Sequence, residues 1–424
     1  MLKEISMKQI RTFPRKNMTR QIRDYGILFL LIGTSGMPFF NGKEFIFIGF
    51  VLSLSIFLYL DKKFTINFLK VALALFFVEC LQFIVYEKIG FDILLSTLMR
   101  LAYVYFVVRI LGTSFTKKFV HIIYFLAVAS LILYPLLYFP SAVNYVRDNI
   151  ATLFHAPFEN TNTFYQASPS IIIWTIHPIH SYAFRNSGAF WEPGGFSVFL
   201  LLAIIFDFQH GGIKFNKRQI VFGLAILSTV STMAFLAYFI IMYYVFFKKM
   251  HLFFKIVMIP LFAIVSYVAY TNLDFLGDKI ANNITVADET TASRFGSALA
   301  DFNLIKESPL IGWGRGTNRY KISSYADFDE ENHRNNGLTN LIVTYGIPMA
   351  LVFLFFYYAN FKEFAVFSGS TEDMTIPFFL VIIVCSFSQV LFMKSMFLSL
   401  LFLKDVYRKM VYTYKIPIAD MSPG

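Results

Sequence analysis

Two arginines beside glycine- and proline-rich motifs are the residues of this sequence best suited to chemistry. Arg185 precedes the Trp-Glu-Pro-Gly-Gly run at 191–195, and Arg294 precedes the Ser-Pro-Leu-Ile-Gly-Trp-Gly run at 308–314. A guanidinium suits phosphate oxygens because its planar fork donates two charge-assisted hydrogen bonds and keeps its proton. The two motifs therefore indicate a membrane-embedded site for an anionic, lipid-linked substrate.

A carboxylate stands inside the first motif. Glu192 precedes Pro193 at the expected start of a helix, where a proline is tolerated because no intrahelical donor is needed. The positive end of the helix dipole favours a carboxylate at this position. We expect Glu192 to orient Arg185 or to bind sugar hydroxyls; the alternative is a capped helix start beside an interfacial Trp191.

Two further charges lie inside expected membrane spans. Glu79 and Arg100 each stand about nine residues from the outer end of their helix, which places them roughly 11–14 Å deep. Charges at such a depth are costly and mark functional candidates. The pair is interpreted either as a structural ion pair or, for Arg100, as part of a diphosphate site.

The second motif continues into a glycine-rich segment that bears Arg315 and Arg319. The polar stretch around it, 272–335, holds ten acidic and seven basic residues, so these arginines are not part of a general basic patch. The spacing Gly312-x-Gly314-x-Gly316 is only a weak phosphate-loop signal, because no strand of a βαβ unit precedes it. We expect Arg315 and Arg319 to contribute to a diphosphate-binding site.

Histidine supplies the remaining candidate near the end of this stretch. His333 is the most plausible group of the stretch to titrate near neutral pH, the alternative being a solvated side chain. His177 and His180 resemble a metal pair only faintly, because no carboxylate or cysteine adjoins them. We therefore assign no metal and no cofactor.

Composition indicates the elements that must hold these residues. The chain of 424 residues is 57% hydrophobic, with a mean hydropathy of +0.60, and only 15% charged, whereas a soluble domain is about one-quarter charged. Apolar runs of near-spanning length recur throughout. The sequence predicts an all-α fold, a polytopic transmembrane helical bundle of about 11–12 spans, in one integral membrane domain, 1–424.

Charge placement sets the expected topology. The net charge of +11 comes from short lysine and arginine clusters between spans, which follows the positive-inside pattern and argues against a nucleic-acid partner. Two long stretches, 140–191 and 272–335, then emerge together as periplasmic loops one and two. The long apolar runs 219–247 and 375–403 should each break, the first near 228–232 and the second, a shallow hairpin, at Lys394-Ser395.

The motifs together resemble the bacterial O-antigen polymerase and O-antigen ligase superfamily. The matching elements are R-x-x-G-x-x-x-E-P at 185–193, S-R…E-x-P-L-x-G-x-G at 293–314, the helix mouth before 340–348, and the late hairpin 387–395. The topological match covers nearly the whole chain. The motifs are concentrated in 185–346, and their order and spacing carry the resemblance.

The resemblance implies a membrane glycosyltransferase of the C type. Such an enzyme is metal-independent and uses undecaprenyl-diphosphate-linked oligosaccharide at the periplasmic face of the bacterial inner membrane. By analogy, Arg185 and Arg294 hold the donor diphosphate, and a histidine at the helix mouth helps to activate the acceptor hydroxyl. Donor and acceptor lipid-linked chains, the bilayer and a chain-length regulator are the implied partners.

Two positions depart from the family pattern. Counting back from Gly346, the usual histidine position falls on Asn335, so His333 and Asn335 are both candidates at the acceptor. The family often carries a basic residue after a T-x-S element, whereas Ser231 is followed here by Thr232-Met233. We expect the missing charge to come from elsewhere, with Arg100 as the candidate.

Four functions compete on the sequence alone. Polymerase, with inversion at the anomeric carbon, is preferred over ligase because the histidine motif is atypical for ligases; the two differ in acceptor, another lipid-linked chain or lipid A-core. A flippase or exporter of lipid-linked oligosaccharide should have short loops and charges in many helices. A receptor or channel lacks a selectivity-filter or repeat signature.

Overall fold

The computed structural model describes residues 18–86, 91–154, 169–176, 184–214, 216–249, 294–315, 336–368 and 373–406. Within these ranges the chain is helical, and the one β-type contact is an isolated bridge between Ser170 and Thr175. The all-α prediction is therefore confirmed. The apolar run 253–271, which the sequence predicts to be a further span, lies outside the described residues.

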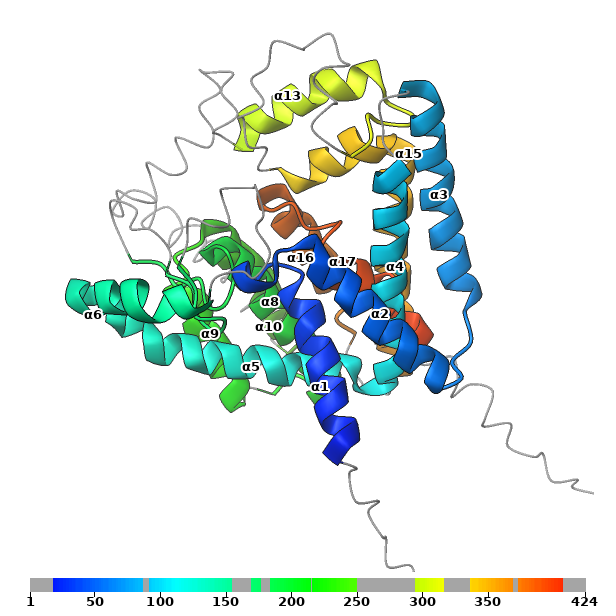
Figure 1. Cartoon of the computed structure of the whole chain (residues 1–424). Helices are drawn as coiled ribbons and strands as arrows, with labels where there is room; N and C mark the ends of the chain where they lie inside the picture. Colours follow the sequence, from blue (N-terminus) through cyan, green and yellow to red (C-terminus); the bar gives the residue numbers. More distant parts are fainter. Residues whose placement is uncertain are drawn as a thin grey trace, which may run out of the picture.

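The first five helices are α1 (Met18–Gly33), α2 (Lys43–Tyr59), α3 (Ile66–Tyr86), α4 (Phe91–Leu111) and α5 (Phe115–Leu133). A short helix, α6 (Pro140–Tyr145), follows, and then the central helix α8 (Pro193–Gly211). The later helices are α9 (Lys217–Ser228), α10 (Thr232–Lys249), α13 (Arg294–Glu307), α15 (Gly337–Phe367), α16 (Thr375–Ser388) and α17 (Ser395–Leu400). Figure 1 shows α13 at one end of the bundle and the start of α1 at the other.

Four described helical stretches are long and apolar enough to cross a membrane: Ile66–Tyr86, Phe91–Tyr138, Pro193–Gly211 and Gly337–Phe367. Their burial differs sharply. In α8, 89% of the apolar window is buried inside the protein, whereas in α3 the share is 22%. A helix that is apolar on all sides and enclosed by protein is a core element. Accordingly, α8 is the central helix, and α3 presents most of its surface to the surroundings.

Both predicted helix breaks are confirmed. The run 219–247 divides into α9 and α10 at residues 229–231, where Val230 has a φ of +47°. The run 375–403 divides into α16 and α17 at residues 389–394. We call residues 389–394 the hairpin tip.

The two arms of this hairpin start and end at the same end of the bundle. Met374, before α16, donates its amide hydrogen to Gln209 near the end of α8, at 3.0 Å. After α17, the short 3-10 helix Leu403–Val406 receives the Arg109 guanidinium on the Asp405 carbonyl, at 2.6 Å. Arg109 lies near the end of α4, and Gln209 lies near the end of α8. Both ends of the hairpin are therefore bonded to the C-terminal ends of these two helices, and the hairpin tip lies between them in the sequence.

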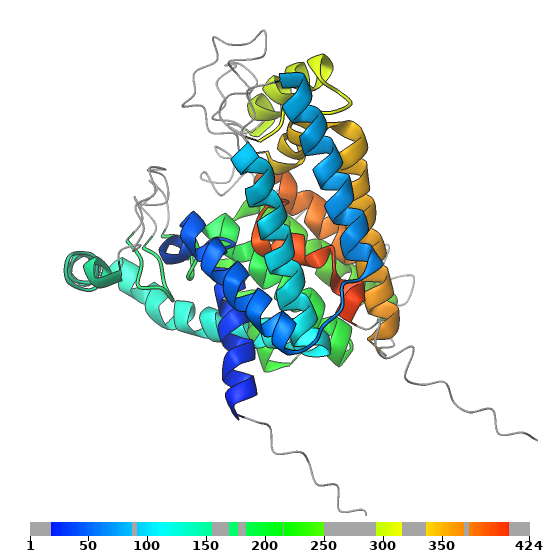
Figure 2. The same cartoon turned by 45° about the vertical axis from the view of Figure 1, so that its right-hand side comes forward.

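The long helix α15 is bent inside its length. Gly346 has a φ of +78°, outside the helical region, and Pro348 stands at the start of the second half, where its missing N–H costs little. The first half lies beneath α13, and the second half runs alongside α3 (Figure 2). The kink therefore changes the direction of α15, so that its first half lies at the end of the bundle and its second half lies at the side of the bundle.

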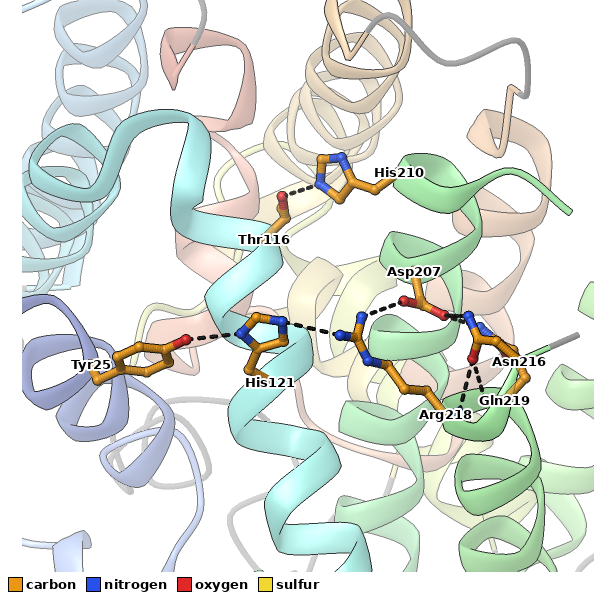
Figure 3. A network of polar contacts seen from close by, with 8 residues as sticks. All are labelled: Tyr25, Thr116, His121, Asp207, His210, Asn216, Arg218 and Gln219. Carbon is orange, nitrogen blue, oxygen red and sulfur yellow. Dashed lines mark hydrogen bonds and ion pairs between the residues drawn. The ribbon is translucent and has the colours of Figure 1, made fainter. Parts of the chain in front are cut away.

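A polar network at the α1 end ties four helices together (Figure 3). His121 on α5 contacts Tyr25 of α1 through Nδ1 at 2.8 Å and Arg218 of α9 through Nε2 at 3.3 Å. Because a guanidinium can only donate, Nε2 accepts and Nδ1 carries the proton to Tyr25. Arg218 also pairs with Asp207 of α8, at 3.1 Å. Two amides, from Asn216 and Gln219, occupy the second oxygen of that carboxylate.

Candidate functional site

The hairpin tip is the meeting point of the elements that carry the predicted residues. Gln389 donates a hydrogen bond to the Glu192 carboxylate at the start of α8. The Met393 carbonyl accepts from Arg100 Nη1 at 2.9 Å. The start of α15 packs so closely on the tip that a Cβ at Gly337 would overlap the Gln389 carbonyl. Three helices thus contact one short, non-helical segment.

The start of α8 has the form that the sequence predicts. Glu192 is the N-cap residue in extended conformation, and Pro193 takes the first helical position. Trp191, which the alternative interpretation placed at the membrane interface, is buried at 8% exposure, because Gly36 and Gly195 leave room for its ring. The Lys394 ammonium lies 4.8 Å from the centre of that ring. This places a cation of the hairpin tip against the ring of the residue that precedes Glu192.

Arg185 lies beside the break between α9 and α10. Its Nε donates to the Thr229 carbonyl at 3.2 Å, and the next residue, Asn186, bonds Ser228 through both its backbone and its side chain. The T-x-S element of the resemblance therefore has a cation beside it, supplied by Arg185. The expectation that Arg100 supplies this charge is wrong, because Arg100 reaches the hairpin tip instead.

The proposed Glu79–Arg100 ion pair is also not formed. Glu79 Oε1 accepts from the Tyr345 hydroxyl at 3.1 Å, whereas Arg100 donates to Met393. Within the described part of the chain, Glu79 Oε2 and Arg100 Nε have no hydrogen-bond partner. The reason is the way the helices pack. Tyr345 of α15 lies against Glu79, and the hairpin tip binds the Arg100 guanidinium.

Arg315 joins this buried cluster from the segment after α13. Its Nη1 donates to Thr97 on α4 at 2.8 Å, and its charge interacts with both Glu79 and Arg100. Among the described residues, no carboxylate lies within salt-bridge distance of either guanidinium. We call Arg100 and Arg315 the arginine pair. Two neighbouring cations inside a membrane protein create a site that favours an anion.

The motif at 308–315 positions Arg315 by docking onto the kink of α15. Trp313 and Gly314 donate their amide hydrogens to the carbonyls of Val343 and Thr344, at 2.7 and 3.0 Å. Gly312 and Gly314 both have positive φ, and a Cβ on Gly312 would lie 2.6 Å from the Gly346 nitrogen. These glycines therefore serve backbone packing. The two amides are already bonded, so the weak phosphate-loop signal does not describe this segment.

Aromatic and amide side chains around the motif make further contacts that hold it on α15. Gln82 on α3 donates to the carbonyls of Ile311 and Thr344, at 2.5 and 2.7 Å. Trp313 donates its ring hydrogen to the Leu304 carbonyl and stacks on Tyr86, with centroids 5.2 Å apart. The carbonyls freed by the kink are thus bonded, which fixes the position of Arg315.

The other predicted residues are only partly placed. The backbone of Arg294 begins α13, and α13 is held to α15 by the buried bond between Thr339 and Asp301. The side chain of Arg294 lies outside the described residues, as do Arg319, His333 and Asn335. Asn336, directly after Asn335, caps α15 by accepting from the amides of Leu338 and Thr339. Residue 335 therefore leads straight into the helix start that packs on the hairpin tip.

Sequence reasoning missed several members of the site. Tyr345 and Thr97 bind Glu79 and Arg315, but each is an ordinary residue of an apolar helix in the sequence. Gln389 and Lys394 were noticed only as part of a helix interruption. A polar residue at a helix break deep in an apolar run is the signal that would have found them.

Part of the chain, including Arg315, matches a known protein family. Residues 219–354 match the family model described as O-antigen ligase. This match supports the O-antigen polymerase and ligase superfamily. The matched region includes the break after α9, all of α13, the 308–315 motif and the kink of α15. Arg100, Arg185, Glu192 and the hairpin tip lie outside it.

The superfamily consists of glycosyltransferase-like enzymes of O-antigen and lipopolysaccharide synthesis. It implies lipid-linked glycan substrates and a membrane environment. The resemblance noted from the motifs is therefore confirmed at the level of the superfamily. No curated protein matches the chain significantly.

Proposed function

We propose that this protein is a polysaccharide polymerase of the O-antigen type. It joins undecaprenyl-diphosphate-linked oligosaccharide repeats at the periplasmic face of the inner membrane, by inverting glycosyl transfer without a metal. The observation that carries the proposal is the arginine pair. Arg100 and Arg315 come from segments far apart in the sequence and lie together without a carboxylate partner among the described residues.

The proposed reaction develops negative charge on its leaving group, and the arginine pair can stabilise that charge. An acceptor hydroxyl oxygen attacks the anomeric carbon of the donor sugar, and the bond from that carbon to the diphosphate oxygen breaks. The diphosphate departs with the bonding electron pair, so negative charge grows on it. Fixed guanidinium groups in a site of low dielectric stabilise that charge without reorganising. The hydroxyl proton passes to His333 or to the departing diphosphate.

The remaining predicted residues receive roles that fit their positions. Glu192, held by Gln389 next to the start of α8, is proposed to bind sugar hydroxyls near the anomeric centre. Arg185 and Arg294 are proposed to bind the diphosphate from the two loops, together with Arg319. His333 and Asn335, just before the α15 cap, are proposed to contact the acceptor.

The distribution of positive charge supports a periplasmic site. Ten lysines and arginines of the described residues stand in or beside the helix ends that Figure 1 draws around the start of α1, opposite α13. They include Arg20, Arg23, Lys62, Lys63, Lys117, Lys118, Lys214, Lys217, Arg218 and Lys404. By the positive-inside rule this end faces the cytoplasm. We infer that the start of α8, which lies at the opposite end of that helix from Gly211, faces the periplasmic side.

An O-antigen ligase is the second candidate, favoured by the description of the matched family model. The test offers purified protein in nanodiscs a lipid-diphosphate oligosaccharide, with or without lipid A-core. A ladder formed from the donor alone supports the polymerase. Transfer only when lipid A-core is present would establish the ligase. Delivery of donor across a proteoliposome membrane without a new glycosidic bond would establish a flippase.

A further inference from the structure

The Glu192 carboxylate stands at the start of α8 without bonding to that helix. Glu192 is the N-cap residue, yet its side chain makes no capping hydrogen bond to the first amides of α8. Instead, its Oε1 accepts a hydrogen bond from the Gln389 side chain. Within the described part of the chain, this is the only hydrogen bond of the Glu192 side chain. The direction of the carboxylate is therefore set by the hairpin tip and not by α8 itself.

Gln389 is enclosed between the starts of two helices. A Cβ at Gly194 of α8 would lie 2.7 Å from Gln389 Nε2, and a Cβ at Gly337 of α15 would overlap the Gln389 carbonyl oxygen. Neither glycine has a positive φ, so what each position requires is the close approach of Gln389. The residue is only 6% exposed. Packing from both helices therefore holds its amide in place.

The same short segment also binds one cation of the arginine pair. The Met393 carbonyl, four residues after Gln389, accepts from Arg100 Nη1 at 2.9 Å. The hairpin tip thus contacts Glu192 at one end and Arg100 at the other. The start of α15, which packs on Gln389, directly follows the two residues predicted to contact the acceptor, His333 and Asn335. Gln389 is therefore the point at which these three parts of the candidate site are joined.

We propose that Gln389 is a positioning residue that acts through Glu192. It holds this carboxylate at a fixed position relative to Arg100 and to the start of α15. The inference rests on the proposed function, in which Glu192 binds sugar hydroxyls. An amide suits this role because it donates to the carboxylate without adding a charge, so Glu192 remains a charged acceptor for hydroxyl groups. A lysine or arginine in its place would pair with the carboxylate and compete with the sugar.

The kinetic test compares two substitutions of similar size. Gln389→Leu removes the hydrogen-bond donor, whereas Gln389→Glu keeps a donor only while the new carboxyl is protonated. Both are assayed in nanodiscs for glycosidic bonds formed from undecaprenyl-diphosphate oligosaccharide, with and without lipid A-core. We expect Gln389→Leu to lower kcat/KM about 10–100-fold at every pH, the factor that corresponds to one hydrogen bond to a charged group.

The pH profile of Gln389→Glu distinguishes positioning from packing. At about pH 5.5 the two adjacent carboxyls share one proton, and the variant should retain about one-third of the wild-type rate. As the pH rises to about 8, both carboxyls ionise and repel each other, so the ratio to the wild type should fall about tenfold. A residue that only fills space would give the same ratio at both pH values.

A double variant and a matched control complete the kinetic test. Gln389→Leu combined with Glu192→Gln should be no less active than Glu192→Gln alone, because both changes remove the same interaction. Gln209→Leu is the control, since Gln209 is a buried glutamine at the opposite end of α8 that bonds Ser368 and Met374. It should lower the thermal stability yet keep kcat/KM within about twofold of the wild type.

Three results would overturn the inference: a wild-type rate in Gln389→Leu, equal losses in the two Gln389 variants at both pH values, or additive losses with Glu192→Gln. If Gln389→Leu does not fold, the pH dependence of Gln389→Glu decides alone. Calorimetric binding of the free oligosaccharide to the same nanodiscs does not depend on turnover. A wild type that forms no glycosidic bond would refute the proposed function. The inference would then stand if binding weakens in Gln389→Leu and recovers at low pH in Gln389→Glu, and it would fall if binding is absent or unchanged.

Discussion

Arg315 donates a hydrogen bond to Thr97 across 2.8 Å, which ties the segment after α13 to the first half of α4. The Thr97 hydroxyl in turn donates to the Ile93 carbonyl at 3.0 Å, so its proton is used within the helix and its lone pair faces Arg315. Through this contact a loop residue reaches the same buried cluster as Arg100.

Removal of either member of the arginine pair should disable the enzyme without unfolding it. We expect Arg100→Ala and Arg315→Ala to lower kcat about 10²–10³-fold, the loss typical when one fixed group that stabilises developing charge is removed. Thr97→Val, which only releases Arg315, should lose less. Arg147→Ala is the matched control, because Arg147 forms an exposed pair with Asp148 away from the cluster. Chain-extension rates of the purified variants measure the effect; near wild-type rates in Arg100→Ala would remove the pair from the site.

The loop arginines give a second prediction. Arg185→Ala and Arg294→Ala should be expressed and folded normally, yet neither should extend chains, because each is proposed to bind the donor diphosphate. Polymer length on a gel, compared at equal protein levels, measures the outcome. Wild-type polymer length in both variants would exclude them from the site.

The acceptor side is tested by comparing two neighbours. His333→Ala and Asn335→Ala are assayed in parallel, and the variant that loses activity locates the acceptor group. If neutral His333 takes the hydroxyl proton, the wild-type rate should fall as the pH drops below about 6.5, where an ordinary histidine becomes protonated. His333→Ala should abolish that pH dependence. A fully active His333→Ala variant with the wild-type pH profile would assign the proton to the leaving diphosphate.

The kink of α15 predicts a stability difference between two glycines. Gly346 and Gly112 both have positive φ, but only Gly346 is in close contact with other backbone, that of Leu310 and Ile311. Gly112→Ala should cost about 1–2 kcal/mol from backbone strain alone. Gly346→Ala should cost clearly more and detach the 308–315 motif. Thermal unfolding in detergent measures both; equal losses would mean that close packing at the kink adds nothing.

Local features of the fold were predictable from the sequence. The break at 229–231 and the hairpin tip are marked by polar residues inside apolar runs, and Pro193 marks the start of α8. These depend on neighbours in the chain, which a sequence displays directly. The membrane class follows from composition in the same way.

Contacts between distant helices were not predictable in this way. The predicted Glu79–Arg100 ion pair is not formed, because a similar depth in two helices does not determine which faces of the helices are in contact. Tyr345, which reaches Glu79, stands directly before the bend of α15 at Gly346, and no spacing rule reports that bend. The charge beside Thr229 comes from Arg185, a residue 44 positions earlier in the chain. Such relationships are set by packing and appear only in three dimensions.

The most direct measurement uses the purified wild-type protein in nanodiscs with undecaprenyl-diphosphate oligosaccharide as sole substrate. Polymer length, released undecaprenyl diphosphate and the anomeric configuration of the new linkage are measured together. A polymerase should give a ladder, release one undecaprenyl diphosphate per linkage formed, and invert the configuration. The absence of any new glycosidic bond, or retention of configuration in the product, would contradict the proposed reaction.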